Sequence, residues 1–199
     1  MPSGEQREHF MVSPARFTRT SRFVLVGVAT TLLTSCAGPA SSSPATGHAL
    51  TAAGPPSVGI LGVPNAKIGN VWRFAFPLFT NNSKTTVRIT SVRLDNVPSG
   101  AQVEGYPVYS MKDTNGYILD SEEGDKNVSG SRDMTKMPNY AGKPIVIRSH
   151  QDSGDYYAMV KVKVVGRIKK HLSGCRVNYT QGSTKYTQKV HCEYALDMK

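Results

Sequence analysis

The stretch that decides the fold is Tyr156-Tyr-Ala-Met-Val-Lys-Val-Lys-Val-Val-Gly-Arg-Ile168, which alternates between two sets of side chains. One face would carry Ala158, Val160, Val162, Val164, Gly166 and Ile168, and the other Tyr157, Met159, Lys161, Lys163, Val165, Arg167 and Lys169. Strict alternation is typical of a strand in an antiparallel sheet that buries one face. We therefore expect a long half-buried strand from Tyr156 to Ile168.

The C-terminal segment predicts a hairpin closed by a disulfide. If Cys175 lies directly opposite Cys192, Val177 faces Val190 and the loop is Gly182-Ser-Thr-Lys185, an ordinary hairpin length. The same pairing collects the apolar side chains on one face: Cys175, Val177, Tyr179, Tyr186, Val190, Cys192, Tyr194 and Leu196. We predict a Cys175–Cys192 bridge, which suits an exported protein in an oxidising compartment.

The remaining apolar runs predict further strands. In 71–79, Trp72, Phe74, Phe76 and Leu78 would share one face. In 87–94 the apolar parity slips after Ile89, which indicates a β-bulge. Seven or eight short strands at this spacing predict an all-β fold and resemble, in architecture only, a single antiparallel immunoglobulin-like β-sandwich. The Cys…Trp…Cys order of antibody domains is absent.

The N-terminus has the features of an export signal. Arg16, Arg19 and Arg22 precede an apolar run that ends at Leu33, as in a secretory signal peptide, and translation starting at Met11 would preserve it. Leu33-Thr34-Ser35-Cys36 resembles the lipobox of bacterial lipoproteins. The resemblance implies removal of residues 1–35, a diacylglycerol on Cys36, and anchoring on the extracytoplasmic face of the cell membrane.

Small, polar and Pro-rich residues dominate the segment after this cysteine. Residues 36–57 lack periodicity and predict a flexible tether, so that 58–199 would form the folded domain.

The charge is strongly basic and unevenly placed. The chain has 199 residues with 24 Lys and Arg against 14 Asp and Glu, a net +10. Removing 1–35 takes away four Arg and two Glu and leaves +8, so the bias belongs to the exported part. If the last three strands are neighbours, their outer faces form one basic patch of Lys161, Lys163, Arg167, Lys169, Arg176 and Lys189. Such a patch would attract anionic envelope polymers, with an ordinary solvated face as the alternative.

Catalytic and metal-binding patterns are weak. No Gly-x-Ser-x-Gly elbow accompanies the histidines, and the carboxylates around Asp120 lie in a polar stretch, so we predict no catalytic residue and no cofactor. Residues 111–122 match part of a calcium loop, but Met111 stands where a carboxylate is required, and we assign no metal ligand. The expected protein is a non-enzymatic, lipid-anchored binding module with an envelope polyanion or protein as partner and no nucleic acid. The alternative is a metal-handling or enzymatic lipoprotein that uses the irregular 112–142 region.

Overall fold

The computed structural model describes residues 43–124 and 133–197. Within these ranges the chain is mostly β, with thirteen strands in several sheets instead of the seven or eight expected. The predicted signal peptide and Cys36 lie outside the described residues. None of the described helices is both long enough and apolar enough to cross a membrane.

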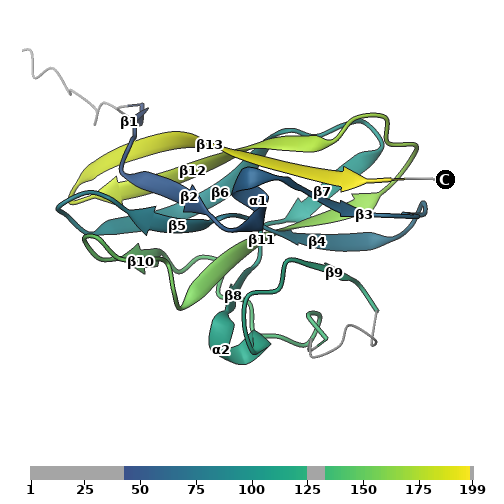
Figure 1. Cartoon of the computed structure of the whole chain (residues 1–199), viewed down its shortest axis with the longest axis horizontal. Helices are drawn as coiled ribbons and strands as arrows, with labels where there is room; N and C mark the ends of the chain where they lie inside the picture. Colours follow the sequence, from purple (N-terminus) through teal and green to yellow (C-terminus); the bar gives the residue numbers. More distant parts are fainter. Residues whose placement is uncertain (1–42, 125–132, 198–199) are drawn as a thin grey trace, which may run out of the picture. The chain divides into compact units, whose positions relative to one another are not determined.

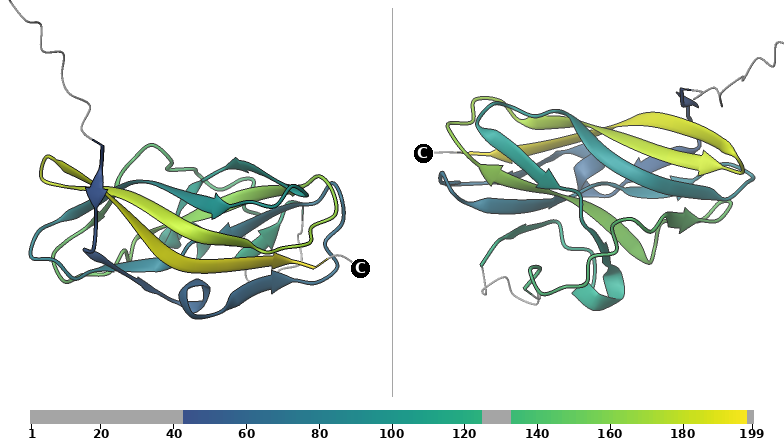
Figure 2. Two further views of the ribbon diagram at one scale, coloured as in Figure 1. Left: turned by 90° about the horizontal axis from the view of Figure 1, so that it is seen from above. Right: turned by 180° about the vertical axis from the view of Figure 1, so that it is seen from behind.

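One large sheet has six strands and contains the C-terminal hairpin. Its order is β1 (Ala45–Thr46), β13 (Thr184–Leu196), β12 (Leu172–Gln181), β6 (Val87–Asn96) and β10 (Ile145–Ile147), with β3 (Ile60–Val63) also paired to β13. The short strands β1 and β3 run parallel to β13, whereas the other pairs are antiparallel. The left view of Figure 2 shows β12 and β13 side by side in this sheet.

The second large sheet has five strands and is antiparallel throughout. Its order is β7 (Ala101–Gly105), β11 (Tyr156–Val164), β4 (Val71–Ala75) and β9 (Asp120–Glu122), with β8 (Val108–Ser110) also paired to β11. A separate pair joins β2 (Leu50–Ala53) to β5 (Leu78–Asn81), and the two single-turn helices are α1 (Pro55–Val58) and α2 (Met111–Thr114). In Figure 1, α2, β8 and β9 are seen below β4 and β11.

The two large sheets share one hydrophobic core. Phe74 and Val162 come from the five-stranded sheet and Val177 and Tyr194 from the six-stranded sheet, and all four are completely buried. The Tyr194 hydroxyl donates a hydrogen bond to the Ala75 carbonyl oxygen at 2.9 Å, which links β13 to β4 across the core. Burial of apolar area on both inner faces is therefore the main force that holds the sheets together.

The central strand β11 is shorter and more deeply buried than predicted. It ends at Val164 instead of Ile168. The face with Val160 and Val162 enters the core as expected, but Tyr157 and Met159 on the other face are also buried. They form a second apolar cluster with Met134 beneath the segment that follows β8. The first half of β11 is therefore covered on both faces, and only its second half has a solvent side.

Pro77 overturns the expected single face of residues 71–79. Phe74 and Phe76 reach the main core, but Leu78 packs on the second cluster and Phe79 enters the core in its place. Because proline has no N–H to donate to a ladder, the chain leaves β4 at this point and resumes as β5, paired with β2.

The C-terminal hairpin contains the predicted Cys175–Cys192 disulfide, with both cysteines buried. The predicted register is wrong by two residues near the turn, because Gln181 pairs with Thr184 and Cys175 faces Val190. Gly182 adopts φ +58°, which suits a two-residue hairpin turn. A slip of two keeps every side chain on its face, so the predicted buried and exposed sets survive the error. Near the bridge, His191 and Cys192 together lie opposite the single Gly174.

The structure confirms the predicted bulge and contradicts part of the predicted tether. The bulge in β6 is confirmed, since Ile89 and Ser91 pair with consecutive residues of β12 and leave Thr90 as the extra residue. The tether prediction is wrong for its second half, because residues 45–58 form β1, β2 and α1, and Leu50 is buried. This segment has no apolar periodicity, but its strands are held by backbone hydrogen bonds to β13 and β5, which need no apolar side chains.

Candidate functional site

The outer face of the six-stranded sheet carries a basic surface, here called the basic face: Arg88, Arg93, Arg176, Lys185 and Lys189. Arg176 on β12 lies directly opposite Arg93 on β6 and opposite Lys189 on β13. Farther along, Thr180 lies between Arg88 and Lys185 in the same way. Since paired strands lie about 4.8 Å apart, the first row brings three cations from neighbouring strands close together, whereas in the second row Thr180 separates the two cations.

Few carboxylates balance these cations. Asp95 accepts two hydrogen bonds from Arg176, from Nε at 2.8 Å and from Nη2 at 2.9 Å, and it lies 3.9 Å from Lys189 Nζ. The hydrogen bond from Arg176 holds the pKa of Asp95 below its usual value. Arg88, Arg93 and Lys185 form no ion pair with any residue in the described part of the chain, so the basic face has a surplus of positive charge.

A shallow hollow of about 330 Å³ lies beside the row of Arg176 and Lys189. Its lining also includes Thr46, Gly47 and His48, residues that the sequence assigned to the tether. The parallel pairing of β1 with β13 places this segment at the sheet edge. Thr46, Gly47 and His48 therefore border the basic face on one side. The rest of the basic face is open to solvent.

The structure separates the six cations that the sequence placed on one patch. Arg176 and Lys189 lie on the basic face, but Lys161, Lys163, Arg167 and Lys169 belong to or follow β11, in the other sheet. The prediction of one patch is wrong because β12 pairs with β6 and β13, not with β11. Sequence reasoning missed Arg88, Arg93 and Lys185. Because Val92 and Leu94 face the core, alternation places Arg93 between them on the outer face, so this residue could have been predicted. Lys185 was missed because the predicted hairpin loop included it.

Lys161 belongs to a compact ionic cluster on the five-stranded sheet. Its Nζ lies 3.0 Å from Glu104 Oε2 and 3.1 Å from Glu123 Oε2, and these carboxylates raise its pKa. Arg73 Nη2 lies 3.3 Å from the same Glu123 oxygen. Glu104 is the extra residue in a β7 bulge, between the positions that pair with Lys161 and Val162. A bulge can redirect a side chain in this way.

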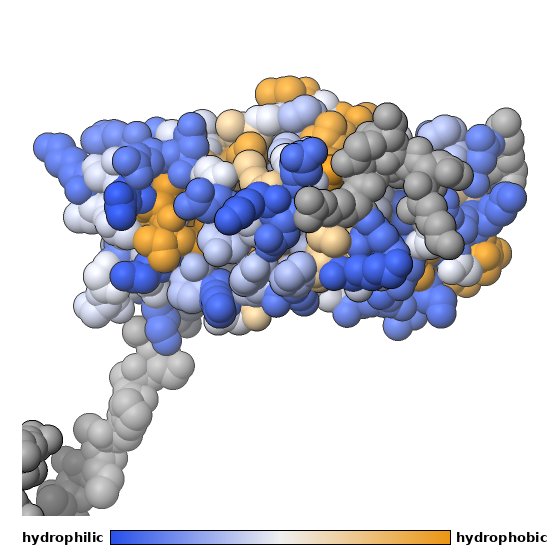
Figure 3. Space-filling model, turned by 90° about the horizontal axis from the view of Figure 1, so that it is seen from below, coloured by the Kyte–Doolittle hydropathy of each residue, from blue (hydrophilic) through white to orange (hydrophobic). Residues whose placement is uncertain are grey.

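The 112–142 region contains no ligand set for a metal within its described residues. Across the described chain, no group of three or more His, Cys, Asp or Glu side chains converges. Residues 111–114 form α2, and Asp113 accepts a hydrogen bond from the Tyr140 hydroxyl at 2.8 Å. Asp120 begins β9, where burial raises its pKa. Figure 3 views the domain from this side, and the described surface there is mostly hydrophilic with separate apolar areas.

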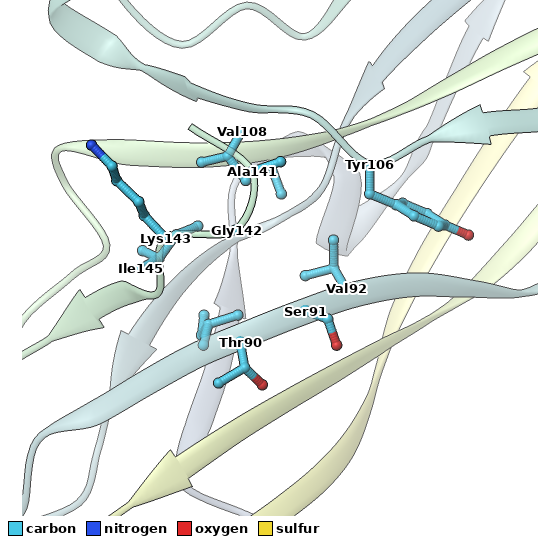
Figure 4. A pocket seen from close by; sticks show the side chains of 11 residues that line it. Thr90, Ser91, Val92, Tyr106, Val108, Ala141, Gly142, Lys143 and Ile145 are labelled. Atoms are coloured by element: carbon cyan, nitrogen blue, oxygen red, sulfur yellow. The ribbon is translucent and has the colours of Figure 1, made fainter. Parts of the chain in front are cut away.

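A further hollow, of about 180 Å³, opens at the edge of β6 beyond β10. In Figure 4, Val92 points towards the side of Tyr106 and Val108, whereas Thr90 and Ser91 point away. The Tyr106 hydroxyl accepts a hydrogen bond from the Leu94 N–H at 3.0 Å. Because β10 pairs only with residues 87–89 of β6, the Leu94 N–H has no strand partner on that side. The Tyr106 hydroxyl accepts its hydrogen bond instead.

Comparisons with known proteins assign no relative. No family model matches the sequence, and no curated protein matches it. Among solved structures, the Vibrio cholerae VesB protease matches with 11% sequence identity and a TM-score of 0.31. The match covers 70% of this chain and 30% of the protease chain. A similarity this low indicates neither a shared fold nor a shared activity.

Proposed function

We propose that this protein is an exported, lipid-anchored, non-enzymatic module that binds an anionic polymer of the cell envelope through its basic face. The observation that carries the proposal is the cross-strand row of Arg93, Arg176 and Lys189, together with Arg88 and Lys185. An extended polymer with repeated negative charges can contact several such cations at once, whereas a small anion can contact only one or two.

The export and anchoring parts of the proposal rest on the leader and the Leu33–Cys36 motif. The Cys175–Cys192 disulfide is in keeping with them, because disulfides persist in oxidising compartments. For the architecture we infer an immunoglobulin-like sandwich, supported by the single core between the two large sheets. The alternative of a metal-handling protein gains no support from the described part of 112–142.

Attraction between an open charged surface and a polymer is largely electrostatic. Salt screens exposed charges with a Debye length of about 8 Å at physiological ionic strength. Binding should therefore weaken steeply as salt rises. The Asp95 carboxylate competes for Arg176, so Arg88, Arg93 and Lys185 should contribute more per side chain than Arg176 does.

The test compares two triple variants of the full-length lipidated protein with equal changes in net charge. Arg88→Glu/Arg93→Glu/Lys189→Glu reverses the basic face, and Lys163→Glu/Arg167→Glu/Lys169→Glu reverses exposed cations on or after β11. Binding is measured to isolated cell envelope and to dextran sulfate, with neutral dextran as the control polymer. We expect the first variant to bind about tenfold more weakly and the second to remain close to wild type. Equal losses in both variants, or no loss in the first, would contradict the proposal.

Anchoring is tested separately, so that its failure cannot be mistaken for failure of polymer binding. Mass spectrometry of the N-terminal peptide should find a diacylglycerol-modified Cys36 as the first residue. Cys36→Ser should lose the lipid and leave the membrane fraction. A mature wild-type protein that begins elsewhere, or lacks lipid, would contradict the anchoring.

A further inference from the structure

Arg73 is a buried cation with unsatisfied donors. Its side chain on β4 is 5% exposed, and the guanidinium reaches Glu123 through Nη2 alone, at 3.3 Å. Nε and Nη1 are shielded from solvent and have no hydrogen-bond partner within the described part of the chain. A charged group left unsatisfied in the interior is costly, so a persistent case calls for a functional explanation.

The neighbouring carboxylates are already engaged. Glu104 and Glu123 both direct Oε2 to Lys161 Nζ, at 3.0 and 3.1 Å. Arg73 therefore shares one oxygen of one carboxylate with a second cation. On the β9 side of β4, Arg73 lies opposite Ser121, which carries no charge. Among the residues that the structure describes, the guanidinium thus lacks a carboxylate of its own, although a planar fork of this kind pairs best with one.

A pocket of about 380 Å³ adjoins this cluster. Arg73 and Lys161 line its charged side, together with Glu104 and Glu123, and Tyr109, Met134 and Met137 supply apolar surface. The lining is mixed, with charged and polar groups beside the apolar ones, and the volume lies within the usual range for a small-molecule site. Methionine side chains adapt readily to ligands of different shape.

We propose that this pocket binds a small amphipathic carboxylate. The carboxylate would accept a hydrogen bond from one of the two unpartnered Arg73 donors, Nε or Nη1, which point in different directions. The apolar body would lie against Tyr109, Met134 and Met137. Because Tyr109, Met134 and the two unpartnered donors of Arg73 are all buried, binding requires the side chains that cover them to move aside. The site lies on the five-stranded sheet and does not involve any residue of the basic face, so it stands or falls independently of the proposed polymer binding.

The experiment uses the full-length protein with ¹³C-labelled methionine methyl groups, because Met134 and Met137 then report directly on the pocket. The probes are 3-phenylpropionate, the neutral analogue 3-phenyl-1-propanol, and inorganic phosphate. We expect 3-phenylpropionate to shift both methyl signals to saturation. The alcohol should bind about tenfold more weakly, since it lacks the charge that the guanidinium recognises. Phosphate lacks the apolar body and should leave both signals unmoved.

Variants assign the effect to the guanidinium. Arg73→Met removes the buried charge and leaves Glu123 paired with Lys161, so thermal unfolding should confirm an intact fold. This variant should bind 3-phenylpropionate about tenfold more weakly. Arg73→Lys tests the fork, because it keeps the charge and should retain part of the affinity. Lys163→Gln, an exposed cation on the same strand as Lys161, is the matched control and should bind as wild type does.

Three results would overturn the proposal. The first is equal binding of the acid and the alcohol, which would make the pocket a non-specific apolar hollow. The second is unchanged binding by Arg73→Met. The third is the absence of any saturable shift of Met134 and Met137 with the acid. If Arg73→Met unfolds, the comparison of Arg73→Lys with Lys163→Gln decides the matter, and equal affinities there would also reject the role of Arg73.

Discussion

The Arg176 guanidinium holds the Asp95 carboxylate through two hydrogen bonds, at 2.8 and 2.9 Å, beside the cationic row of Arg93, Arg176 and Lys189. Asp95 is thus an internal competitor for the anions that the basic face is proposed to bind. Asp95→Asn should release Arg176 and Lys189 and strengthen dextran sulfate binding a few-fold. Binding assays at several salt concentrations check this. Unchanged binding would show that Arg176 does not take part.

The same pair gives a pH dependence with a defined sign. Arg176 lowers the folded-state pKa of Asp95 below the ordinary value of 3.8. Stability from this pair is therefore present above that value and is lost as pH falls through the folded pKa. Thermal unfolding from about pH 6 to pH 2 should show the wild type losing its advantage over Asp95→Asn at the acid end. An advantage that persists at the lowest pH would contradict this.

Gly100 allows a close approach between two backbone segments. A Cβ at this position would lie 2.5 Å from the Arg167 carbonyl oxygen and 2.7 Å from that of Gly166. Both contacts are backbone, which cannot swing away, so Gly100→Ala should lower the free energy of unfolding by about 1–3 kcal/mol. Chemical denaturation measures the loss. Gly154→Ala is the matched control, since nothing lies within 4 Å of its added Cβ.

The Cys175–Cys192 bridge closes a loop with a sequence separation of 17. In the chain-entropy model such a loop contributes about 3 kcal/mol. A reductant should therefore lower the unfolding temperature of the wild type. The double variant Cys175→Ala/Cys192→Ala should start lower and be insensitive to the reductant. A wild type that is equally stable in oxidised and reduced form would contradict the prediction.

Tyr194 links the sheets through a hydroxyl that must stay protonated. Tyr194→Phe removes the hydrogen bond to Ala75 and should cost about 1–2 kcal/mol near neutral pH. Burial raises the folded-state pKa of Tyr194 well above 10.0. Its stabilisation is present in full below that value and is lost as pH rises towards the folded pKa. The variant should therefore show a shallower alkaline loss of stability than the wild type. Tyr186→Phe, a hydroxyl without a hydrogen bond among described residues, is the control.

Side-chain parity was the most predictable property of this chain. The buried faces of the hairpin and of β11 around Val160 follow from alternation alone, and the β6 bulge follows from its slip. Strand partners could not be predicted, because parity is the same whichever strand lies next to β11. The role of 43–57 was also hidden, since β1 and β2 are held by backbone ladders rather than by apolar periodicity. Arg73 alternates with Trp72 and Phe74 and so looked like an outward residue, whereas the structure buries it.

The first strand of the domain begins at Ala45, and this has a consequence for reach. If Cys36 carries a lipid, nine residues, 36–44, precede that strand. Even fully extended, nine residues span no more than about 32 Å. A module on so short a connection meets only polymers that pass close to its own bilayer. Its targets would then be selected by their distance from the membrane as much as by their charge.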